Sequence, residues 1–412
     1  MNTEEFLERK FREYYRENAY RIQPPAKMQE REFGFAYFKD RMMVRHRQFT
    51  STGELRRFVE DSAPSDVYYS TAYYSKPEEE MDQKGWLGAD LLFDIDADHI
   101  PTPCKKSHDH WICKACGRSG KGTNPQTCPS CRSERFEEHT WVCELCLKQA
   151  KNEVTKLVDF LTDDYGFSRK EMKTFFTGHR GYHLHVTSDA IIGLDSDERK
   201  EIVDYLLGNG LALDSIGILE RGSTKLSLPN KLNETKGWNR RIIQKLVATI
   251  ENGNEDELLN LGFKRTVMDT ILGARVRIVK HEDVDKLFES LDSHVVRSRS
   301  WEKIIRRVVE ECSARIDTVV TTDIHRLIRA KETLNGKTGL RTVEVDIQGL
   351  QSFDPFEMAI GIKGGQETVE IEDAPEFQLE GSTFGPYKNQ KVTLPVSAAV
   401  LLVSKGKACP VT

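Results

Sequence analysis

The sequence predicts an α/β or α+β fold: a core of mixed sheets flanked by helices, interrupted by a zinc-ribbon insert and a helical insert. Three observations lead to this prediction. Strand-like and helix-like segments alternate along much of the chain, six cysteines form three Cys-x-x-Cys pairs, and residues 197–293 have mostly helical periodicity. The expected organisation is a core made of residues 1–103, 147–195 and 295–412, a zinc-binding insert at 104–146 and a helical insert at 196–294.

Length and composition bound the class of protein. A chain of 412 residues with 38% hydrophobic and 30% charged residues can form two or three globular domains. Residues 1–16 lack the apolar run of a secretory signal, and the apolar run 398–403 is too short to span a membrane. We therefore expect a cytoplasmic protein with no membrane partner. The net charge of −5 excludes a basic nucleic-acid coat, but it allows a local basic channel.

Hydrophobic periodicity predicts the elements in order. Helical spacing marks segments 3–20, 147–163 and 300–313, besides the long region 197–293. Strand-like composition marks the segments 31–49, 66–75, 89–96, 175–186, 315–320 and 340–412.

The strand predicted at 89–96 carries acids on one face. Residues two apart in a strand share a face, so Asp94 and Asp96 project together while their apolar neighbours enter a core. Paired carboxylates suit a hard divalent cation. A solvated turn or a helix cap is the ordinary alternative. A calcium loop is excluded, because its sixth and twelfth positions would be His99 and Lys105 instead of Gly and Glu.

The cysteine-rich block has the spacing of zinc ligands. Two Cys-x-x-Cys knuckles separated by eleven residues predict one tetrahedral zinc site, formed by Cys113, Cys116, Cys128 and Cys131. A second set would consist of Cys104, His110, Cys143 and Cys146, although the spacing fits His108 as well as His110. The alternative is a single zinc ion with the outer cysteines merely buried. Closed four-ligand sites are structural, so neither is expected to be catalytic.

A turn around Gly178–Gly181 is rich in groups that bind phosphate. Arg180 can form a forked contact with phosphate oxygens, Thr177 can donate a further hydrogen bond, and the glycines permit close backbone approach. His183 lies on the strand that follows. The alternative is a tight hairpin whose polar residues have no ligand.

A third acid and more cations follow later in the chain. Asp317 lies in an extended apolar segment and is expected on a strand, from which it could join Asp94 and Asp96 to hold two divalent ions. A helix is expected to begin near Asp323. Candidates for triphosphate contacts are Arg326, Arg329 and Lys337, although each could also be an ordinary surface charge.

These motifs together resemble the small catalytic subunit of archaeal and eukaryotic DNA primase. The resemblance is carried, in the family's order, by Asp-Ile-Asp-Ala-Asp-His at 94–99, Thr-Gly-His-Arg-Gly-Tyr-His at 177–183, and the segment from Asp317 to Arg329 before Gly-Lys-Thr-Gly. Segments 32–35, 45–46 and 67–70 resemble the family's N-terminal strands, so the likeness covers about residues 30–360.

The resemblance implies a primase-type core and template-directed synthesis of short primers from nucleoside triphosphates on single-stranded DNA. It implies Mg²⁺ or Mn²⁺ at Asp94, Asp96 and Asp317, besides Zn²⁺ at the cysteines, and a large regulatory subunit as partner. It places Arg180 and His183 at the nucleotide phosphates, with Arg326, Arg329 and Lys337 near them. Glu32 and Arg45 would lie at the edge of the site.

The sequence departs from the family in three places. Thr177 replaces a common Ser but keeps the hydroxyl, Asn335 replaces a common His before Gly-Lys, and the ribbon at 113–131 is an insertion. Three other functions remain open from sequence: a metal-dependent nuclease, a non-catalytic zinc-ribbon adaptor for nucleic acid, and a primase-polymerase of repair or plasmid origin.

Overall fold

The acidic segment forms an edge strand of an antiparallel sheet. In the computed structural model, which describes residues 2–39, 43–214, 235–278 and 298–411, it is strand β6 (Leu91–Asp96). The sheet has the order β13-β10-β11-β6, with β10 Met172–Phe176, β11 Gly181–Val186 and β13 Val343–Val345. In β6, Phe93 and Ile95 are fully buried, while Asp94 and Asp96 are half-buried. The predicted alternation is therefore confirmed.

A second antiparallel sheet comes from the N-terminal part and one late strand. Its order is β12-β3-β1-β2, with β1 Phe33–Ala36, β2 Met43–Arg47, β3 Asp66–Ser70 and β12 Leu327–Arg329. The first helix, α1 (Thr3–Asn18), begins at a capping box made by Asn2 and Glu5. Helix α2 (Thr52–Ser62) begins where the Ser51 hydroxyl accepts a hydrogen bond from the Glu54 amide.

The remaining strands form three smaller sheets and a three-stranded sheet in the cysteine-rich segment. The pairs are β4 Ala72–Tyr74 with β5 Trp86–Ala89, and β15 Phe377–Leu379 with β16 Ser382–Phe384. The C-terminal sheet has the order β17-β14-β18, with β14 Gln366–Ala374, β17 Tyr387–Pro395 and β18 Ala408–Pro410. The cysteine-rich segment has the order β8-β7-β9, with β7 His110–Cys113, β8 Ser119–Lys121 and β9 Phe136–His139. Every strand pair among the described residues is antiparallel, so the α+β class is confirmed.

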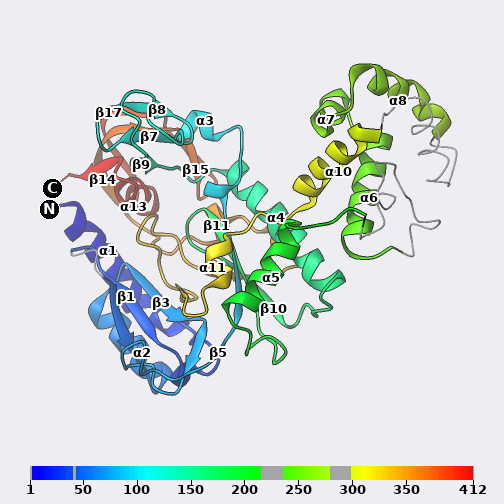
Figure 1. The fold of residues 1–412 in the computed structure, drawn as a ribbon. Helices are drawn as coiled ribbons and strands as arrows, with labels where there is room; N and C mark the ends of the chain where they lie inside the picture. Colours follow the sequence, from blue (N-terminus) through cyan, green and yellow to red (C-terminus); the bar gives the residue numbers. More distant parts are fainter. Residues whose placement is uncertain (1, 40–42, 215–234, 279–297, 412) are drawn as a thin grey trace. The chain divides into compact units, whose positions relative to one another are not determined.

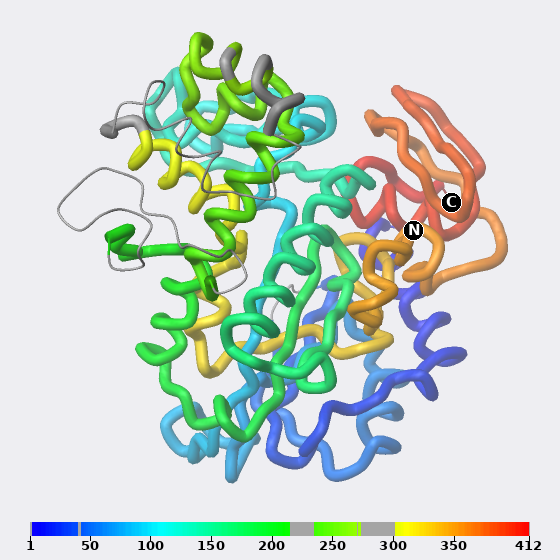
Figure 2. Tube along the Cα trace, turned by 90° about the vertical axis from the view of Figure 1, so that its right-hand side faces the viewer, coloured from blue at the N-terminus to red at the C-terminus, as the bar shows by residue number. Residues whose placement is uncertain are grey.

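Helices join these sheets. They are α3 Lys105–His108, α4 Glu144–Asp163, α5 Ser196–Leu207, α11 Thr318–Thr322, α12 Pro355–Met358 and α13 Val396–Ser404, with short 3₁₀ turns at Ala19–Arg21, Met28–Glu30, Ala97–His99 and Leu350–Ser352. The apolar run 398–403 lies in the region 340–412, for which strands were predicted, but it forms the middle of the buried helix α13. Helix α1 packs against α13 and β18, so the first and last elements lie side by side (Figures 1 and 2).

The chain forms two compact units. The first consists of residues 1–155, 168–199 and 316–412, and the second of residues 156–167 and 200–315. Within the second unit, α6 (Gly237–Asn252), α7 (Glu255–Leu261) and α10 (Ser298–Cys312) pack together, with α8 (Arg265–Ile278) against α6 and α7. Helix α10 is part of this unit, and its side chains Trp301, Ile304 and Ile305 are buried. Parts of the predicted helical region, 215–234 and 279–297, lie outside the described residues.

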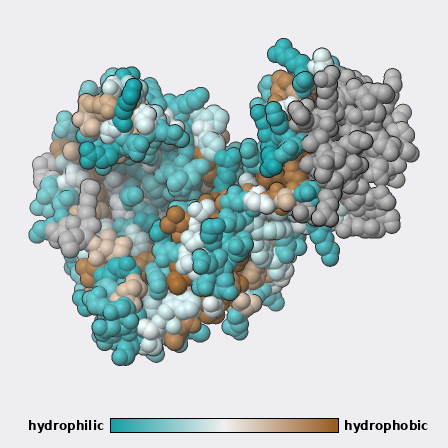
Figure 3. All heavy atoms as spheres, in the orientation of Figure 1, coloured by the Kyte–Doolittle hydropathy of each residue, from teal (hydrophilic) through white to brown (hydrophobic). Residues whose placement is uncertain are grey.

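The segment of the first unit that ends at Arg199 is bonded to the chain just before β6. The side chain of Arg199, which is buried, donates hydrogen bonds from its two Nη atoms to the carbonyl oxygens of Asp90 and Ala89, at 2.9 and 2.8 Å. On the face drawn in Figure 3, the described surface is mostly hydrophilic, and apolar side chains lie in small groups. None of the helices within the described ranges is long and apolar enough to cross a membrane.

Candidate active site

Strand pairing places Asp94 opposite His183. The two residues are register partners between β6 and β11, and His183 Nε2 lies 3.6 Å from Asp94 Oδ1. Burial, followed by the charges of Arg329 and Arg326, lowers the pKa of His183 to about 3. The imidazole is therefore neutral at physiological pH, so it can exchange hydrogen bonds beside the acid without adding charge.

Asp317 joins Asp94 from a distant part of the chain. Its backbone N–H donates a hydrogen bond of 2.9 Å to the carbonyl oxygen of Asp94. The predicted strand at this position is wrong: Asp317 is the N-cap of α11, and its Oδ1 accepts hydrogen bonds from the amides of Val319 and Val320 at 3.0 and 3.4 Å. The helix end fixes the carboxylate beside β6 just as a strand would have done.

The environment of Asp94 disfavours its charged form. Burial, and next the negative charge of Asp317, raise the pKa of Asp94 from 3.8 to about 6. Arg326 and Arg329 oppose this rise only in part. A site that holds two acids with incomplete compensation is suited to a cation with oxygen ligands.

Asp96 is the third expected acid. Its side chain accepts a hydrogen bond of 2.8 Å from the amide of Asp98, which fixes it at the start of the 3₁₀ turn. The three carboxylates do not converge as closely as the cysteines do. In the described part of the chain, only two Cys-containing sets bring three or more such ligand atoms within 4.8 Å of one another.

A cavity of about 430 Å³ opens at Asp94 and His183 and is called here the Asp94 cavity. Its lining includes Arg45, Tyr68, Asp323, His325, Arg326 and Arg329, with apolar contributions from Met43, Leu92 and Val320. Thus the structure brings together two of the predicted triphosphate contacts, Arg326 and Arg329, at one of the predicted acids.

Arg329 reaches this cavity from a strand, β12, and Arg326 directly precedes that strand. The prediction that a helix begins near Asp323 is wrong, because residues Leu327–Arg329 form strand β12, which pairs with β3. On that strand Arg329 donates from Nε to Asp66 Oδ1 at 3.0 Å and from Nη2 to the Tyr68 hydroxyl at 3.1 Å. These bonds hold the guanidinium in one position beside the cavity.

Arg45 lines the Asp94 cavity, and Glu32 holds it in place. Glu32 is fully buried and accepts hydrogen bonds from Arg45 Nε and from the backbone of His46, at 2.8 and 3.1 Å. Lys84 lies 2.5 Å from its other oxygen. Arg45 thereby faces the Asp94 cavity from a fixed anchor.

The Gly178–Gly181 turn is closed by its own polar groups. The Thr177 hydroxyl donates to the Gly181 carbonyl oxygen at 3.1 Å, so it is used within the turn. The fold itself requires glycine at both positions. A Cβ on Gly181 would lie 2.4 Å from the Ile95 carbonyl oxygen, and Gly178 has φ +75°.

Arg180, a residue of this turn, is part of a buried ionic cluster. Its guanidinium is fully buried and pairs with Asp98 at 2.5 Å and with Asp109 at 3.3 Å. Sequence reasoning placed this arginine on a phosphate and did not single out Asp109. Asp109 could have been found from its position directly after His108, a candidate metal ligand, because such histidines are often held by a carboxylate.

Lys337 and Asn335 form the loop that faces the turn. The buried Asn335 amide donates to the Thr177 carbonyl oxygen at 3.0 Å, and its oxygen accepts from the Lys337 backbone at 2.9 Å. The residue that replaces the family's His therefore has a structural use. Lys337 does not line the Asp94 cavity with Arg326 and Arg329, but a separate cavity together with His179 and Lys405.

The ribbon cysteines converge as the spacing predicts. The sulfur atoms of Cys113 and Cys131 lie 3.6 Å apart, and those of Cys116 and Cys128 lie 3.7 Å apart. Tetrahedral Zn–S bonds of about 2.3 Å require sulfur atoms about 3.8 Å apart. The four thiols therefore fit a zinc ion.

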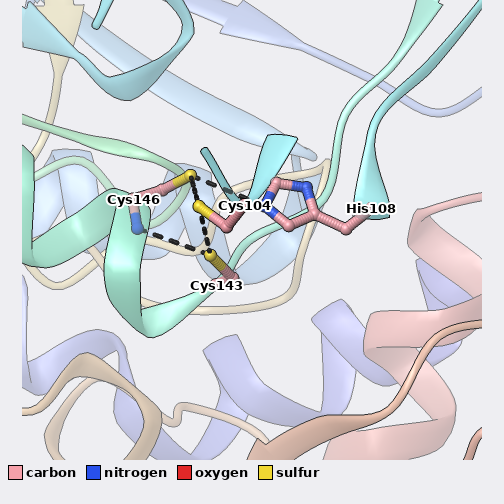
Figure 4. Close-up of side chains that lie close together, drawn as sticks. All are labelled: Cys104, His108, Cys143 and Cys146. Atoms are coloured by element: carbon pink, nitrogen blue, oxygen red, sulfur yellow. Dashed lines mark hydrogen bonds between the residues drawn. The ribbon is translucent and has the colours of Figure 1, made fainter. Parts of the chain in front are cut away.

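The outer cysteines form a second set with His108 (Figure 4). Cys104 Sγ lies 3.5 Å from Cys146 Sγ and 3.6 Å from Cys143 Sγ, and His108 Nε2 lies 3.6 Å from Cys146 Sγ. The prediction that His110 belongs to this set is wrong. This histidine lies on β7 and stacks on His139 at a centroid distance of 4.5 Å, whereas Cys104 and His108 are four residues apart at helix α3 and share a face.

Asp109 connects this metal set to the turn. His108 Nδ1 lies 2.7 Å from Asp109 Oδ1, the same oxygen that pairs with Arg180. A carboxylate on the far nitrogen of a metal-binding histidine fixes its tautomer and orientation. The second cysteine set is thereby linked to the turn that follows β10.

Comparison with known proteins decides the family. The family model described as DNA primase small subunit matches residues 128–347. The chain belongs to the DNA primase small subunit family. It is 34% identical to the DNA primase small subunit PriS of Methanococcoides burtonii, covering 99% of this chain and 98% of that protein. It is 33% identical to PriS of Archaeoglobus fulgidus, covering 99% of each, and 31% identical to PriS of Cenarchaeum symbiosum, covering 98% and 97%.

This membership confirms the resemblance drawn from the motifs. The chain is a small catalytic primase subunit, a nucleotidyltransferase that makes primers for DNA replication. The nuclease and adaptor alternatives are not needed to account for any of these matches. The roles of single residues in this primase subunit are a separate question.

Proposed function

We propose that the primase subunit joins nucleoside triphosphates on a single-stranded DNA template at the Asp94 cavity. The observation that carries the proposal is the proximity of Asp94 to His183 and to Asp317, whose backbone is bonded to that of Asp94, with Arg326 and Arg329 lining the same cavity as Asp94. Acids for metal ions therefore lie beside cations for phosphates, which is the donor set that phosphoryl transfer requires.

Asp94, Asp96 and Asp317 are the proposed ligands of two Mg²⁺ or Mn²⁺ ions. The raised pKa of Asp94 supports a cation there, since a divalent ion would offset the repulsion from Asp317. When bound, the ions supply activation of the primer 3′-hydroxyl and charge neutralisation on the leaving pyrophosphate.

The cationic side chains act on the substrate directly. Arg326 and Arg329 would offset the charge that develops on the phosphates, and Arg329 is already held in position by Asp66 and Tyr68. Neutral His183 would donate or accept a hydrogen bond at the same phosphates. Arg180 is paired with Asp98 and the Thr177 hydroxyl is bonded to Gly181, so both would stabilise the turn next to the site. Lys337, which lines a neighbouring cavity, would contact the phosphates from there.

Both Cys-containing sets are proposed to bind Zn²⁺ as structural ions. The ligand distances support zinc, and four protein ligands leave no open position for a substrate. We also propose a large regulatory subunit as partner, with cytoplasmic location, as for archaeal-type replication proteins.

The test is unprimed synthesis on a single-stranded template, with and without the candidate large subunit. Asp94→Ala and Asp317→Ala should abolish nucleotide incorporation, while the exposed acid of β14 in Asp373→Ala should leave it unchanged. Circular dichroism and zinc content should remain normal in all three. Normal incorporation by either active-site variant would refute the assignment. Cleavage of labelled template without nucleotides would favour a nuclease.

A further inference from the structure

The zinc ribbon and the four residues after it, 113–135, concentrate positive charge and are called here the ribbon segment. The whole chain has a net charge of −5, whereas this segment contains a single acid, Glu134. Its basic side chains are all exposed, and they belong to Lys114, Arg118, Lys121, Arg132 and Arg135. In the described part of the chain, no carboxylate forms an ion pair with any of them. The segment therefore has a local positive potential that the fold does not neutralise.

The two Cys-x-x-Cys knuckles of the ribbon have the same backbone hydrogen bonds. The amide of Gly117 donates to the Cys113 carbonyl oxygen at 2.9 Å, and the amide of Arg132 donates to the Cys128 carbonyl oxygen at 2.9 Å. In each knuckle, the amide of the first cysteine also donates to a carbonyl oxygen five residues later, at 2.7 and 2.9 Å. Arg132 therefore occupies in the second knuckle the position that Gly117 occupies in the first.

This shared position requires a left-handed backbone. The φ angle is +74° at Gly117 and +58° at Arg132. Glycine adopts this region freely, whereas a residue with a Cβ is strained in it. The knuckle geometry thus favours glycine at both positions. An arginine kept at a strained position points to a use of its side chain outside the local fold.

The Arg132 side chain has no partner within the fold. It is exposed, and its guanidinium forms no hydrogen bond or ion pair with any residue that the structure describes. Arg118 differs, because its Nη1 donates to the Ser130 hydroxyl at 2.7 Å and so connects the two knuckles. Interactions within the described protein therefore do not account for the arginine at position 132.

The ribbon segment suits a polyanion better than an apolar partner. Across the described ranges, every large hydrophobic side chain that is exposed lies outside residues 113–135. Protein interfaces usually have apolar or aromatic anchors at their centre. Single-stranded nucleic acid is instead bound by cations that follow its phosphate backbone.

We propose that the ribbon segment is a contact surface for the phosphate backbone of single-stranded nucleic acid, with Arg132 retained for that contact. The proposed function supplies only the identity of the strand, which is the template. The contact is independent of base sequence, because the segment contains no aromatic residue on which a base could stack. It is separate from the Asp94 cavity, whose lining includes no residue of this segment.

A purely structural role for Arg132 would be to offset the negative charge of four thiolates on zinc. The two roles predict opposite effects when glycine replaces the arginine. If the side chain serves nucleic acid, the variant loses only backbone strain and should hold zinc more tightly. If the side chain serves the zinc site, the variant loses a compensating charge and should hold zinc less tightly.

The first measurement is fluorescence anisotropy of a labelled single-stranded oligonucleotide with the zinc-loaded protein, over a range of salt concentrations. Arg132→Gly and Arg132→Ala should each weaken binding about fivefold at about 0.1 M salt, and each should lower the slope of log K against log salt by about 0.7, the value for one phosphate contact. Arg132→Lys keeps the charge and should bind nearly as wild type does. The control is Arg57→Gln, at an exposed arginine of α2, which should leave affinity and slope unchanged.

The second measurement is the rate of zinc release to a chromogenic chelator in the same proteins. Arg132→Gly should release zinc several-fold more slowly than wild type, because the strain at this position is relieved. Arg132→Ala lacks the charge but keeps the Cβ and the strain, so it should release zinc at the wild-type rate.

The two measurements together decide the proposal. Weaker oligonucleotide binding with slower zinc release in Arg132→Gly supports it. Unchanged affinity and salt slope overturn it and leave an acidic protein as the partner of the segment. Faster zinc release overturns it as well and assigns Arg132 to the zinc site. Neither measurement depends on synthesis, so the supporting pair of results in a protein that makes no primers upholds the contact and overturns the proposed function.

Discussion

Replacing Asp94 with Asn should remove activity and yet stabilise the protein when divalent ions other than zinc are absent. The pKa of Asp94 is raised from 3.8 to about 6 by burial and by Asp317. A raised pKa means that folding favours the protonated acid. Its contribution to stability is therefore complete below pH 3.8 and is lost as the pH rises through about 6. At pH 7.5 the wild-type protein carries that penalty, whereas the neutral amide does not.

The size of the effect follows from the shift. A difference of about two pKa units corresponds to about 3 kcal/mol, which is an upper bound because the Asp94 side chain is 21% exposed to solvent. For a unit of this size, 1 kcal/mol moves the melting temperature by about 2 °C. Asp94→Asn should therefore melt several degrees above wild type at pH 7.5, and the two proteins should converge near pH 4.

Scanning fluorimetry measures this without reference to catalysis. Zinc content must be equal in the two proteins, and Mg²⁺ or Mn²⁺ is then added to each. The ions should raise the melting temperature of wild type more than that of Asp94→Asn, because a carboxylate ligand is missing in the variant. A variant that melts below wild type in metal-free buffer at pH 7.5 would refute the electrostatic reasoning about the two acids.

Three further predictions concern the parts that position this site. His108→Ala should lower the zinc content from two ions to one by elemental analysis, and His110→Ala should retain both; the reverse result would restore the ligand predicted from sequence. Asp317→Asn should keep the helix cap and lose activity, while Asp317→Ala should also lose about 1 kcal/mol of stability by denaturant titration; equal stability of the two would mean that the cap contributes nothing. Gly181→Ala should destabilise the first unit severely, since its Cβ would lie 2.4 Å from the Ile95 carbonyl oxygen, and a normal melting temperature would contradict that contact.

The sequence predicted the parts of the site in which local pattern and tertiary structure agree. Alternation of apolar and acidic residues located β6, and Cys-x-x-Cys spacing located the ribbon thiols. Asp317 was placed on a strand because β-branched valines follow it, yet an Asp before Thr and Val also has the side chain of an N-cap. Helix α13 was missed although Pro395 precedes it and Gly406 follows it, an arrangement typical of helix ends.

Other features depended on distances that no sequence pattern encodes. His108 could have been preferred to His110 from its four-residue spacing to Cys104, but only if a helix had been predicted there. The engagement of Arg180 by Asp98 and Asp109 joins three segments, so sequence could not distinguish it from a free phosphate ligand. The domain division predicted from sequence is a hypothesis that limited proteolysis can examine.

The longer of the two segments that leave the first unit departs after Arg199 and returns at Ile316, and these two points have a consequence for insertions and deletions. Arg199 is bonded to the carbonyl oxygens of Ala89 and Asp90, and Asp317 to that of Asp94, so both points are tied to one short stretch of chain. Four residues of strand span only about 13 Å, which a flexible linker of about six residues can bridge. Insertions and deletions between residues 200 and 315 can therefore accumulate without moving the carboxylates, because the acidic strand itself sets the spacing of the two anchors.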